Sequence, residues 1–576
     1  MESIDRKSYP AYKSAQGIFD FGDYHLSIDH VQGDPFASPS KLSIFISHQK
    51  AGYPETLFDA PHKKRAFEDY LVRRFHKETA QYNFKAKGSG KSGLISISCP
   101  GPEILERTAC ECSPQGIWIR LEAGFPANGR TINSSELIRI LFDFLPRCVK
   151  QVLFYKNRPS REPEAVAELA EDQYFIRQEL KRLGLVSFVA DGAILPRESG
   201  ISSRPMKNSV PFSSPESMRI TLNLPHHGSC SGMAIRRGIT LIVGGGYHGK
   251  STLLKALEAG VYDHIAGDGR EFVITDETAL KLRAEDGRSI RNVDISMFIN
   301  DLPNKKDTRC FSTEDASGST SQAAGVIEGI ESGSHVFLID EDTSATNFMV
   351  RDDLMQKVIS RSQEPITPFS CRAEDLFEKA GISTILVAGS SGAYFYIADT
   401  IIQMDSYVPQ DITKKVREIC AEYGGSFAEP APGFVIPKAG RKLQSAAAQR
   451  NQIQKFKEGH RYSHGPRGRE QAGREDRIKV KVYGKDSIEV GRHPVDLRFV
   501  EQLIDSEQTH ALAQILRFCL EKQLLERYTV AETVAYIQKE TAKGGLTAVS
   551  GCSYAAMGLC MPRPQEIFAC INRFRG

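Results

Sequence analysis

Residues 241–251 hold the side chains with the clearest chemical meaning in this chain. They read LIVGGGYHGKS and match the phosphate-binding pattern GxxxxGK[ST] at Gly244, Gly249, Lys250 and Ser251. Glycines let backbone N–H groups approach a polyphosphate, the lysine reaches the β- and γ-phosphates, and the hydroxyl ligates Mg²⁺. The pattern predicts that the chain binds a nucleoside triphosphate with Mg²⁺. The predicted nucleotide-binding residues are Gly244, Gly245, Gly246, Tyr247, His248, Gly249, Lys250, Ser251 and Thr252.

The segments on either side of this loop can hold it in the required place. Residues 239–243 are apolar and β-branched, which is typical of a buried strand. Residues 252–261 carry Leu253, Leu257 and Val261 at helical spacing. A strand, a glycine-rich loop and a helix in this order put the helix N-terminus on the phosphates. A chance match in a glycine-rich turn is the alternative, and this context argues against it.

Two carboxylates, Asp340 and Glu341, follow a second apolar run at residues 336–339. If that run is a strand, the pair lies at its carboxyl end, where open α/β sheets bind ligands. Asp340 is then placed to hold Mg²⁺ through water, and Glu341 is the candidate catalytic residue that polarises the attacking water. Acidic pairs are also common on protein surfaces, so this prediction depends on further motifs.

Three further segments occur in the order expected of one class of ATPase. Residues 317–322 read SGSTSQ and begin 23 positions before Asp340, since 340 − 317 is 23. Residues 340–347 read DEDTSATN, and residues 384–388 form another apolar strand candidate. In order and spacing these segments resemble the signature segment, the acidic motif with its D-loop, and the strand before the switch position of ABC-class ATPases.

The resemblance implies an ATPase in which two copies of the chain share each nucleotide site. Ser317, Gly318 and Ser319 of one copy then meet the γ-phosphate bound by the other copy. Ser344 and Asn347 belong to the D-loop. The implied cofactors are ATP and Mg²⁺, with Ser251 and Asp340 as metal ligands, and the implied partner is a second copy in a homodimer closed by ATP.

The chain departs from the class at the switch position. Where these ATPases usually carry a histidine that contacts the γ-phosphate, residues 389–392 read GSSG, with Ser390 at the expected place. A serine donates one hydrogen bond but carries no charge, so we expect slow turnover. Residues 294–303 occupy the interval of the class's partner-linking glutamine without matching it, and no aromatic residue is assigned to stack on adenine.

Segments spread over the chain resemble a family of predicted ATPases of the ABC class. They are VQGDPFASPS (31–40), LIVGGGYHGKST (241–252), GDGRE (267–271), DEDTSATN (340–347) and MPRPQEIFACINRFR (561–575). The family includes a kinetoplastid mitochondrial protein associated with RNA editing. The resemblance therefore implies an N-terminal family domain, a central ATPase core, a small C-terminal domain, and RNA as a partner.

Length and composition fit that layout. The chain has 576 residues, of which 40% are hydrophobic and 25% charged, enough for about three domains with separate cores. The expected fold is α/β, a P-loop NTPase core of ABC-ATPase type, with an α+β N-terminal domain and a small α-rich C-terminal domain. The expected segments are 1–200, 216–430, a basic flexible linker at 431–477, and 478–576.

The formal net charge of +3 does not by itself indicate a nucleic-acid-binding protein. Residues 438–481, however, hold 13 Lys and Arg against four acidic residues, a balance of +9 (13 − 4). Such a segment attracts phosphate backbones without sequence preference, although a solvated tether is an equal alternative. A second cluster of cations surrounds Phe67, Tyr70 and Phe75. Their helical spacing favours a core face over base stacking.

Other features limit the class of protein. Apolar runs approaching the ~20 residues needed to cross a bilayer do not occur, and cysteines are scattered without any CxxC. We therefore expect an intracellular, cytoplasmic and soluble protein with reduced thiols. The leading prediction is an ATP-hydrolysing enzyme that dimerises on nucleotide and acts on RNA or a ribonucleoprotein. The alternatives are an ATP-gated protein scaffold with slow turnover and a P-loop kinase.

Overall fold

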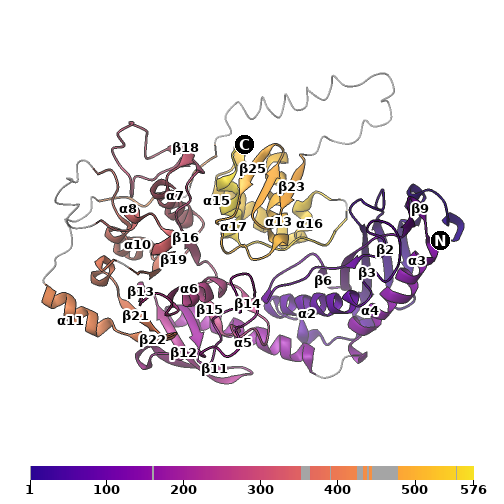
Figure 1. The fold of residues 1–576 in the computed structure, drawn as a ribbon, viewed down its shortest axis with the longest axis horizontal. Coiled ribbons are helices and arrows are strands. Elements are labelled where there is room, and N and C mark those ends of the chain that lie inside the picture. The colour runs from indigo at the N-terminus through magenta and orange to yellow at the C-terminus, as the bar shows by residue number, and fades with distance from the viewer. Residues whose placement is uncertain are drawn as a thin grey trace.

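The structure is a computed structural model that describes residues 2–157, 161–351, 364–389, 391–423, 433–437, 440–443, 478–552 and 554–576. We refer to residues 2–157 as the N-terminal unit, 161–423 as the core unit and 478–576 as the C-terminal unit. Each unit has its own large apolar cluster, and a further cluster contains residues of all three. Figure 1 shows the N-terminal unit at one end of the molecule, the core unit at the other, and the C-terminal unit beside both.

The N-terminal unit is built on an antiparallel sheet in the order β1-β2-β3-β7-β4, with β6 paired to β7. Alternate residues of β3 (Ser40–Ser47), among them Leu42 and Ile44, are buried, as the period of two in a strand requires. Helix α2 (Pro61–Ala80) buries Phe67 and Phe75 in the same cluster, so the core interpretation of these aromatics is correct. The other elements are β1 (Gly17–Asp20), β2 (His25–His30), α1 (His48–Ala51), β4 (Ile95–Ser96), β5 (Glu103–Ile104), β6 (Cys110–Ser113), β7 (Gly116–Ala123), β8 (Ala127–Asn128), β9 (Thr131–Ile132), α3 (Ser134–Arg139) and α4 (Leu145–Val152).

Helix α5 (Glu162–Leu183) is the first element of the core unit and lies against the N-terminal unit. It ends at Gly184, whose left-handed backbone terminates the helix, and it packs against α2. The chain then enters β10 (Leu185–Ala190), the third strand of an antiparallel sheet ordered β11-β12-β10-β15. The other strands of that sheet are β11 (Arg219–Leu224), β12 (Gly228–Arg236) and β15 (Val273–Thr275).

A second sheet of the core unit carries the predicted motifs. Its order is β16-β19-β20-β13-β21-β22, and its pairs are parallel except for β21 with β22. The strands are β13 (Ile239–Val243), β16 (Leu280–Leu282), β19 (Val336–Asp340), β20 (Ser383–Val387), β21 (Thr400–Asp405) and β22 (Val408–Asp411). Besides α5, the described helices of this unit are α6 (Lys250–Ala259), α7 (Gly318–Glu331), α8 (Thr346–Met349), α10 (Ala373–Ala380) and α11 (Thr413–Tyr423). Two further pairs are β17 (Arg288–Val293) with β18 (Phe311–Ala316), and β14 (Asp263–His264) with β5.

Both faces of this sheet are buried. In β19 the residues Phe337 and Ile339 belong to the cluster that contains α7, whereas Val336 and Leu338 belong to the cluster that contains α6. Continuous apolar runs are expected for parallel strands that helices cover on both sides. The expected α/β core is therefore confirmed, and the strands predicted at 239–243, 336–339 and 384–388 are among its strands.

The C-terminal unit combines a small sheet with several helices. The sheet order is β23 (Val480–Tyr483), β24 (Ser487–Val490) and β25 (His493–Asp496). The helices are α13 (Ser506–Glu521), α14 (Leu524–Arg527), α15 (Val530–Gly544), α16 (Thr547–Ser550) and α17 (Pro564–Arg573). Thr529 and Glu532 form the capping box of α15, in which each side chain bonds the backbone N–H of the other. The unit is helix-rich, as predicted.

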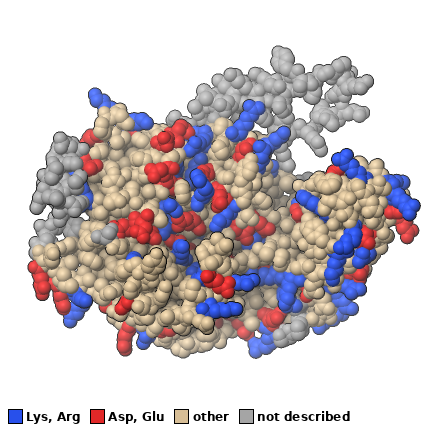
Figure 2. Space-filling model, in the orientation of Figure 1, with Lys and Arg blue, Asp and Glu red and all other residues tan. Residues whose placement is uncertain are grey.

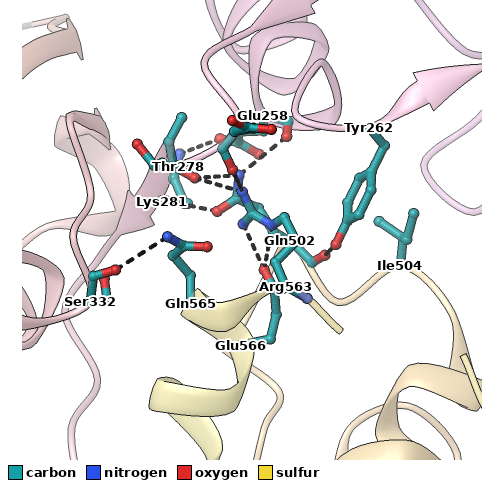
Figure 3. Close-up of polar contacts among 12 residues, drawn as sticks. Glu258, Tyr262, Thr278, Lys281, Ser332, Gln502, Ile504, Arg563, Gln565 and Glu566 are labelled. Carbon is teal, nitrogen blue, oxygen red and sulfur yellow. Dashed lines mark hydrogen bonds and ion pairs between the residues drawn. The ribbon is translucent and has the colours of Figure 1, made fainter. Parts of the chain in front are cut away.

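The C-terminal unit contacts the far ends of two core helices through polar side chains (Figure 3). Gln502 Nε2 donates to the carbonyl of Glu258, near the end of α6, at 3.2 Å. Gln565 Nε2 donates to the carbonyl of Ser332, which follows α7, at 3.4 Å. Tyr262 lies just beyond α6 and donates to the carbonyl of Gln502 at 2.9 Å. The two helices that begin at predicted site motifs are thus both held by this unit at their other ends.

The predicted domain limits at 200, 216, 430 and 478 stay predictions. Of the linker expected at 431–477, residues 433–437 and 440–443 are described, and the remainder lies outside the described residues. Arg441, one of its cations, forms an ion pair with Glu331 at 2.8 Å.

Candidate nucleotide-binding site

The loop between β13 and α6 has a backbone that requires glycine at two positions. Gly244 has φ of +143°, and a Cβ there would lie 2.4 Å from the carbonyl oxygen of Met404. Gly249 has φ of +99°, and a Cβ there would lie 2.8 Å from the ring of Tyr407. Any L side chain at either position would be strained and would collide with a neighbour. The glycines of the motif are therefore needed for the shape of the loop.

Lys250 is the first residue of α6, and its side chain folds back over the loop. Its Nζ donates to the carbonyl oxygens of Gly244 at 2.7 Å and Gly245 at 2.9 Å. The first N–H groups of a helix have no partner within the helix and carry the positive end of its dipole. With Ser251 exposed beside them, the lysine and these N–H groups form a cradle suited to an anion.

The turn between β21 and β22 supports this loop from the other side. The N–H of Ser406 donates to Nδ1 of His248 at 2.9 Å, and the N–H of Tyr407 donates to the His248 carbonyl at 3.1 Å. Asp405 places a carboxylate oxygen 3.0 Å from the same ring nitrogen. Sequence reasoning missed this turn, because no motif marks it and it lies 158 residues from the loop.

The two carboxylates lie at the same edge of the sheet as the loop. Asp340 is the last residue of β19, is buried, and accepts a hydrogen bond from the N–H of Asp342 at 3.2 Å. Glu341 follows it, and its Oε2 accepts from the N–H of Gly389 at 2.6 Å. Because β20 pairs in parallel with both β13 and β19, the carboxyl ends of all three strands share one edge.

Residues of the predicted signature segment contact the predicted D-loop within the same chain. Ser319 Oγ donates to Oδ1 of Asn347 at 2.6 Å, and Gln322 Nε2 donates to Oγ of Ser344 at 2.9 Å. The Ser344 hydroxyl in turn donates to the carbonyl of Asp340 at 2.8 Å. A chain of hydrogen bonds therefore joins helix α7 to the end of β19. Gln322 is buried and was not among the predicted site residues, although it lies within the SGSTSQ segment.

Ser317 caps α7 and remains accessible. Its hydroxyl lies 2.9 Å from that of Thr320 and accepts from the Thr320 N–H at 3.5 Å. Gly318, the first residue of the helix, is half-buried. The predicted switch residue Ser390 lies outside the described residues, and its neighbour Gly389 is the N–H donor to Glu341. The assignments of roles to these residues stay predictions.

Other sequence expectations concern metals, thiols and membranes. In the part of the chain that the structure describes, no three His, Cys, Asp or Glu side chains are grouped so that they could hold a metal. The twelve cysteines are free, and seven of them are buried. Among the described helices, none is both long and apolar enough to span a bilayer.

Three models of known protein domains match successive parts of the chain. The ABC ATPase P-loop domain matches residues 160–437, the N-terminal domain of ATPases of the ABC class matches residues 1–156, and the MRB1590 C-terminal domain matches residues 479–576. The uncharacterized protein MJ1628 of Methanocaldococcus jannaschii is 31% identical over 231 residues, which cover 38% of this chain and 50% of that protein. The matched region thus spans about half the length of this relative.

Two solved structures resemble part of the fold. One is cbiO1 from Clostridium perfringens, part of the ABC transporter complex cbiONQ, with 13% identity, 35% of this chain and 89% of that chain covered, and a TM-score of 0.23. The other is the ADP conformation of MJ1267, an ATP-binding cassette of an ABC transporter, with 10% identity, 41% and 95% covered, and a TM-score of 0.25. The three successive domain matches support an ABC-class ATPase that resembles the MRB1590 family.

Proposed function

We propose that two copies of this chain bind and hydrolyse ATP with Mg²⁺ between them and use the cycle to act on RNA or a ribonucleoprotein. The observation that carries the ATPase part is the shared sheet edge. It presents the glycine loop before α6 together with Asp340 and Glu341 after β19. A phosphate cradle beside two carboxylates is the arrangement that hydrolysis of a triphosphate requires.

The proposed site residues have separate tasks. Lys250 would exchange the carbonyls of Gly244 and Gly245 for phosphate oxygens, a stronger, charge-assisted interaction. Ser251 and the buried Asp340 would hold Mg²⁺ together with the phosphates, since this ion is usually bound through one or two protein oxygens plus substrate. When bound, Mg²⁺ neutralises phosphate charge. Glu341 would accept a proton from the attacking water.

The proposed dimer explains why Ser317, the first residue of the signature segment, is exposed in its own chain. Ser317 and Gly318 begin α7 and would complete the γ-phosphate site of the second copy. Through Gln322 and Ser344 the same helix is bonded to the carbonyl of Asp340 in its own site. Closure of the dimer around one nucleotide would therefore shift Asp340 and Glu341 at the other nucleotide site.

The proposal can be tested by the solution mass of Glu341→Gln with Mg·ATP and with Mg·ADP. Removing the carboxylate that accepts the proton should trap a closed dimer with ATP, whereas ADP should leave a smaller or more open species. Adding Ser317→Arg should abolish that shift while leaving ATP bound, because Ser317 serves the other copy. A dimer that forms equally with either nucleotide, or with Ser317→Arg present, would refute the shared site.

RNA as the target is supported by the end of α2 and the loop that follows it in the N-terminal unit. Lys77, Lys85, Lys87 and Lys91 form no ion pair with any described residue, and Lys85 lies over the ring of Tyr82. Phe84 between them is 48% exposed. Cations interleaved with an exposed ring are suited to single-stranded nucleic acid. Figure 2 shows further Lys and Arg side chains over the end of the molecule formed by this unit.

We expect Lys85→Glu with Lys87→Glu to weaken binding of single-stranded RNA and to flatten its salt dependence by about 1.4 in log–log slope, from two lost phosphate contacts. Fluorescence titration over a range of salt concentrations measures both. Lys414→Glu with Lys415→Glu, exposed on α11, makes the same charge change and should have a smaller effect. Equal losses in the two variants would leave only a net-charge effect and would argue against this loop.

A scaffold with slow turnover is favoured by one contact. Glu341 Oε2 accepts from the Gly389 N–H, which holds the carboxylate against the backbone of the β20 end. Phosphate release measured with and without RNA separates the two functions. An ATPase that acts on RNA should be stimulated by it, and a scaffold should bind ATP and RNA with little release under either condition. Transfer of phosphate to an acceptor instead of water would indicate a kinase.

A further inference from the structure

Tyr247 stands out within the phosphate loop because its side chain projects from the surface of the part of the chain that the structure describes. It is 99% exposed, and no hydrogen bond or ring contact joins it to any described residue. Its backbone has φ of +65°, in the left-handed region that disfavours residues with a Cβ. A glycine at this position would remove the strain, and the preceding residues, Gly244 to Gly246, are all glycine.

No contact of the Tyr247 side chain with the described residues therefore offsets the strain of its backbone. Strained backbone of this kind is stored at functional sites, and an exposed tyrosine offers a large, rigid surface for a partner. Tyr247 belongs to the loop that forms the cradle with Lys250, and its side chain is exposed, so a partner that meets this loop can contact the ring. A second copy of this chain is one such partner under the proposed function.

The start of α7 offers a surface onto which a ring could pack. A Cβ added to Gly318 would lie 3.3 Å from Cβ of Ala284, 3.4 Å from a carboxylate oxygen of Asp286 and 3.5 Å from Cβ of Ala345. Gly318, Ala284 and Ala345, the small-residue patch, are each half-buried and carry no side chain larger than a methyl group, and the Asp286 carboxylate borders them. The patch adjoins Ser317, which the proposed dimer places against the phosphate loop of the other copy.

We propose that in the ATP-closed dimer the Tyr247 ring of each copy packs on the small-residue patch of the other. This inference rests on the proposed function, because it needs the shared nucleotide site. The projecting ring and the patch belong to the same chain, so a two-fold axis makes the contact twice. Tyr247 is then a positioning residue: it is buried only on closure and aligns the signature segment with the phosphate cradle.

This role predicts that substitution of Tyr247 affects the affinity between the two copies more than the affinity for Mg·ATP. Tyr247→Gly keeps the loop backbone and relieves its strain, so the Mg·ATP affinity of an isolated copy should change less than the affinity between the two copies. Its closed dimer loses two ring contacts and should dissociate at least tenfold more readily. Tyr247→Phe keeps the ring and should restore dimerisation to within threefold, because packing and not the hydroxyl is responsible.

The test uses the full chain carrying Glu341→Gln, with Mg·ATP affinity measured at protein concentrations below dimerisation and dimer dissociation measured by sedimentation. Tyr423→Ala, an 84% exposed tyrosine at the end of α11, is the matched control and should behave as the parent. A Tyr247→Gly dimer as tight as the parent would overturn the inference. Loss of ATP affinity without a change in dimerisation would also overturn it, by assigning the ring to the nucleotide. Failure of the parent itself to dimerise would refute the proposed function, and this inference with it.

Discussion

At the scale of single residues, glycine decides whether the phosphate loop can form. The loop passes under the β21–β22 turn, and Gly244 and Gly249 are the points of closest approach. Gly245 and Gly246 do not have positive φ, and a Cβ on Gly246 would meet no atom within 4 Å. Glycines that look equivalent in the sequence therefore differ in what they contribute.

We predict that Gly249→Ala lowers the affinity for Mg·ATP at least tenfold. The left-handed backbone costs about 1–2 kcal/mol for an L residue, and the added Cβ would in addition press on the ring of Tyr407. Isothermal titration with Mg·ATP measures the loss, and Gly246→Ala is the control, with an expected change of a few-fold at most. If the two variants weaken binding equally, the close approach to Tyr407 is not what shapes the loop.

The glycines were predictable from sequence, whereas the partners that hold them were not. The pattern at Gly244, Gly249 and Lys250 is local, so eight residues suffice to recognise it. The support from Ser406 and Tyr407 depends on β21 lying beside β13, a pairing made by parallel strands far apart in the chain. Tyr407 also has positive φ, a property that its residue type does not reveal.

At the scale of elements, helices and parallel strands were predictable because their apolar patterns are long. The strand before the loop, the strand before Asp340 and the helix after the loop all follow from such patterns. Short strands are harder to recognise. Strands β23 to β25 have four residues each and bury at most two, too few to separate a period of two from chance.

The contact between α2 and β6 creates a titratable group inside the N-terminal unit. Glu68 on α2 is buried, and its Oε1 accepts from the N–H of Cys112 at 2.7 Å. Burial raises the pKa of Glu68 from its ordinary 4.5 to about 7, and the Cys112 hydrogen bond opposes that rise. Between these values the folded chain holds a proton that the unfolded chain releases.

The sign of the pH effect follows from that difference. The free energy of unfolding should fall as pH rises from about 4.5 to about 7, by at most about 3 kcal/mol, and stay level above. Glu68→Gln should remove this fall, so at pH 8 the variant should be more stable than the parent. Urea unfolding of both chains at pH 5 and pH 8 measures the difference, with the exposed Glu55→Gln as control. An unchanged pH dependence in Glu68→Gln would show that another group is responsible.

At the scale of the whole molecule, the C-terminal unit contacts both other units, which also contact each other. It holds the ends of α6 and α7 through Gln502 and Gln565, and it joins the N-terminal unit through Arg107. The N-terminal unit returns to the core unit through the pairing of β5 with β14. Displacement of α6 or α7 during nucleotide hydrolysis would therefore displace the C-terminal unit and, through it, the N-terminal unit that carries Lys85 and Lys87.

Arg107 joins the N-terminal and C-terminal units through two largely buried ion pairs. Its Nη2 lies 2.6 Å from Asp505 and its Nη1 lies 2.7 Å from Glu507, and only 2% of its side chain is exposed. Arg107→Met should lower the free energy of unfolding by about 3–5 kcal/mol, because it leaves two largely buried carboxylates without a partner. Urea unfolding measures the loss, which should be at least half recovered when Asp505→Asn and Glu507→Gln are added. Arg147→Met breaks an exposed pair with Asp143 and should cost less than about 1 kcal/mol. If Arg107→Met is no less stable than Arg147→Met, the contact between the N-terminal and C-terminal units does not depend on the charge of Arg107. Other contacts, such as the hydrogen bond from the Thr108 N–H to the Leu559 carbonyl, would then hold the two units together.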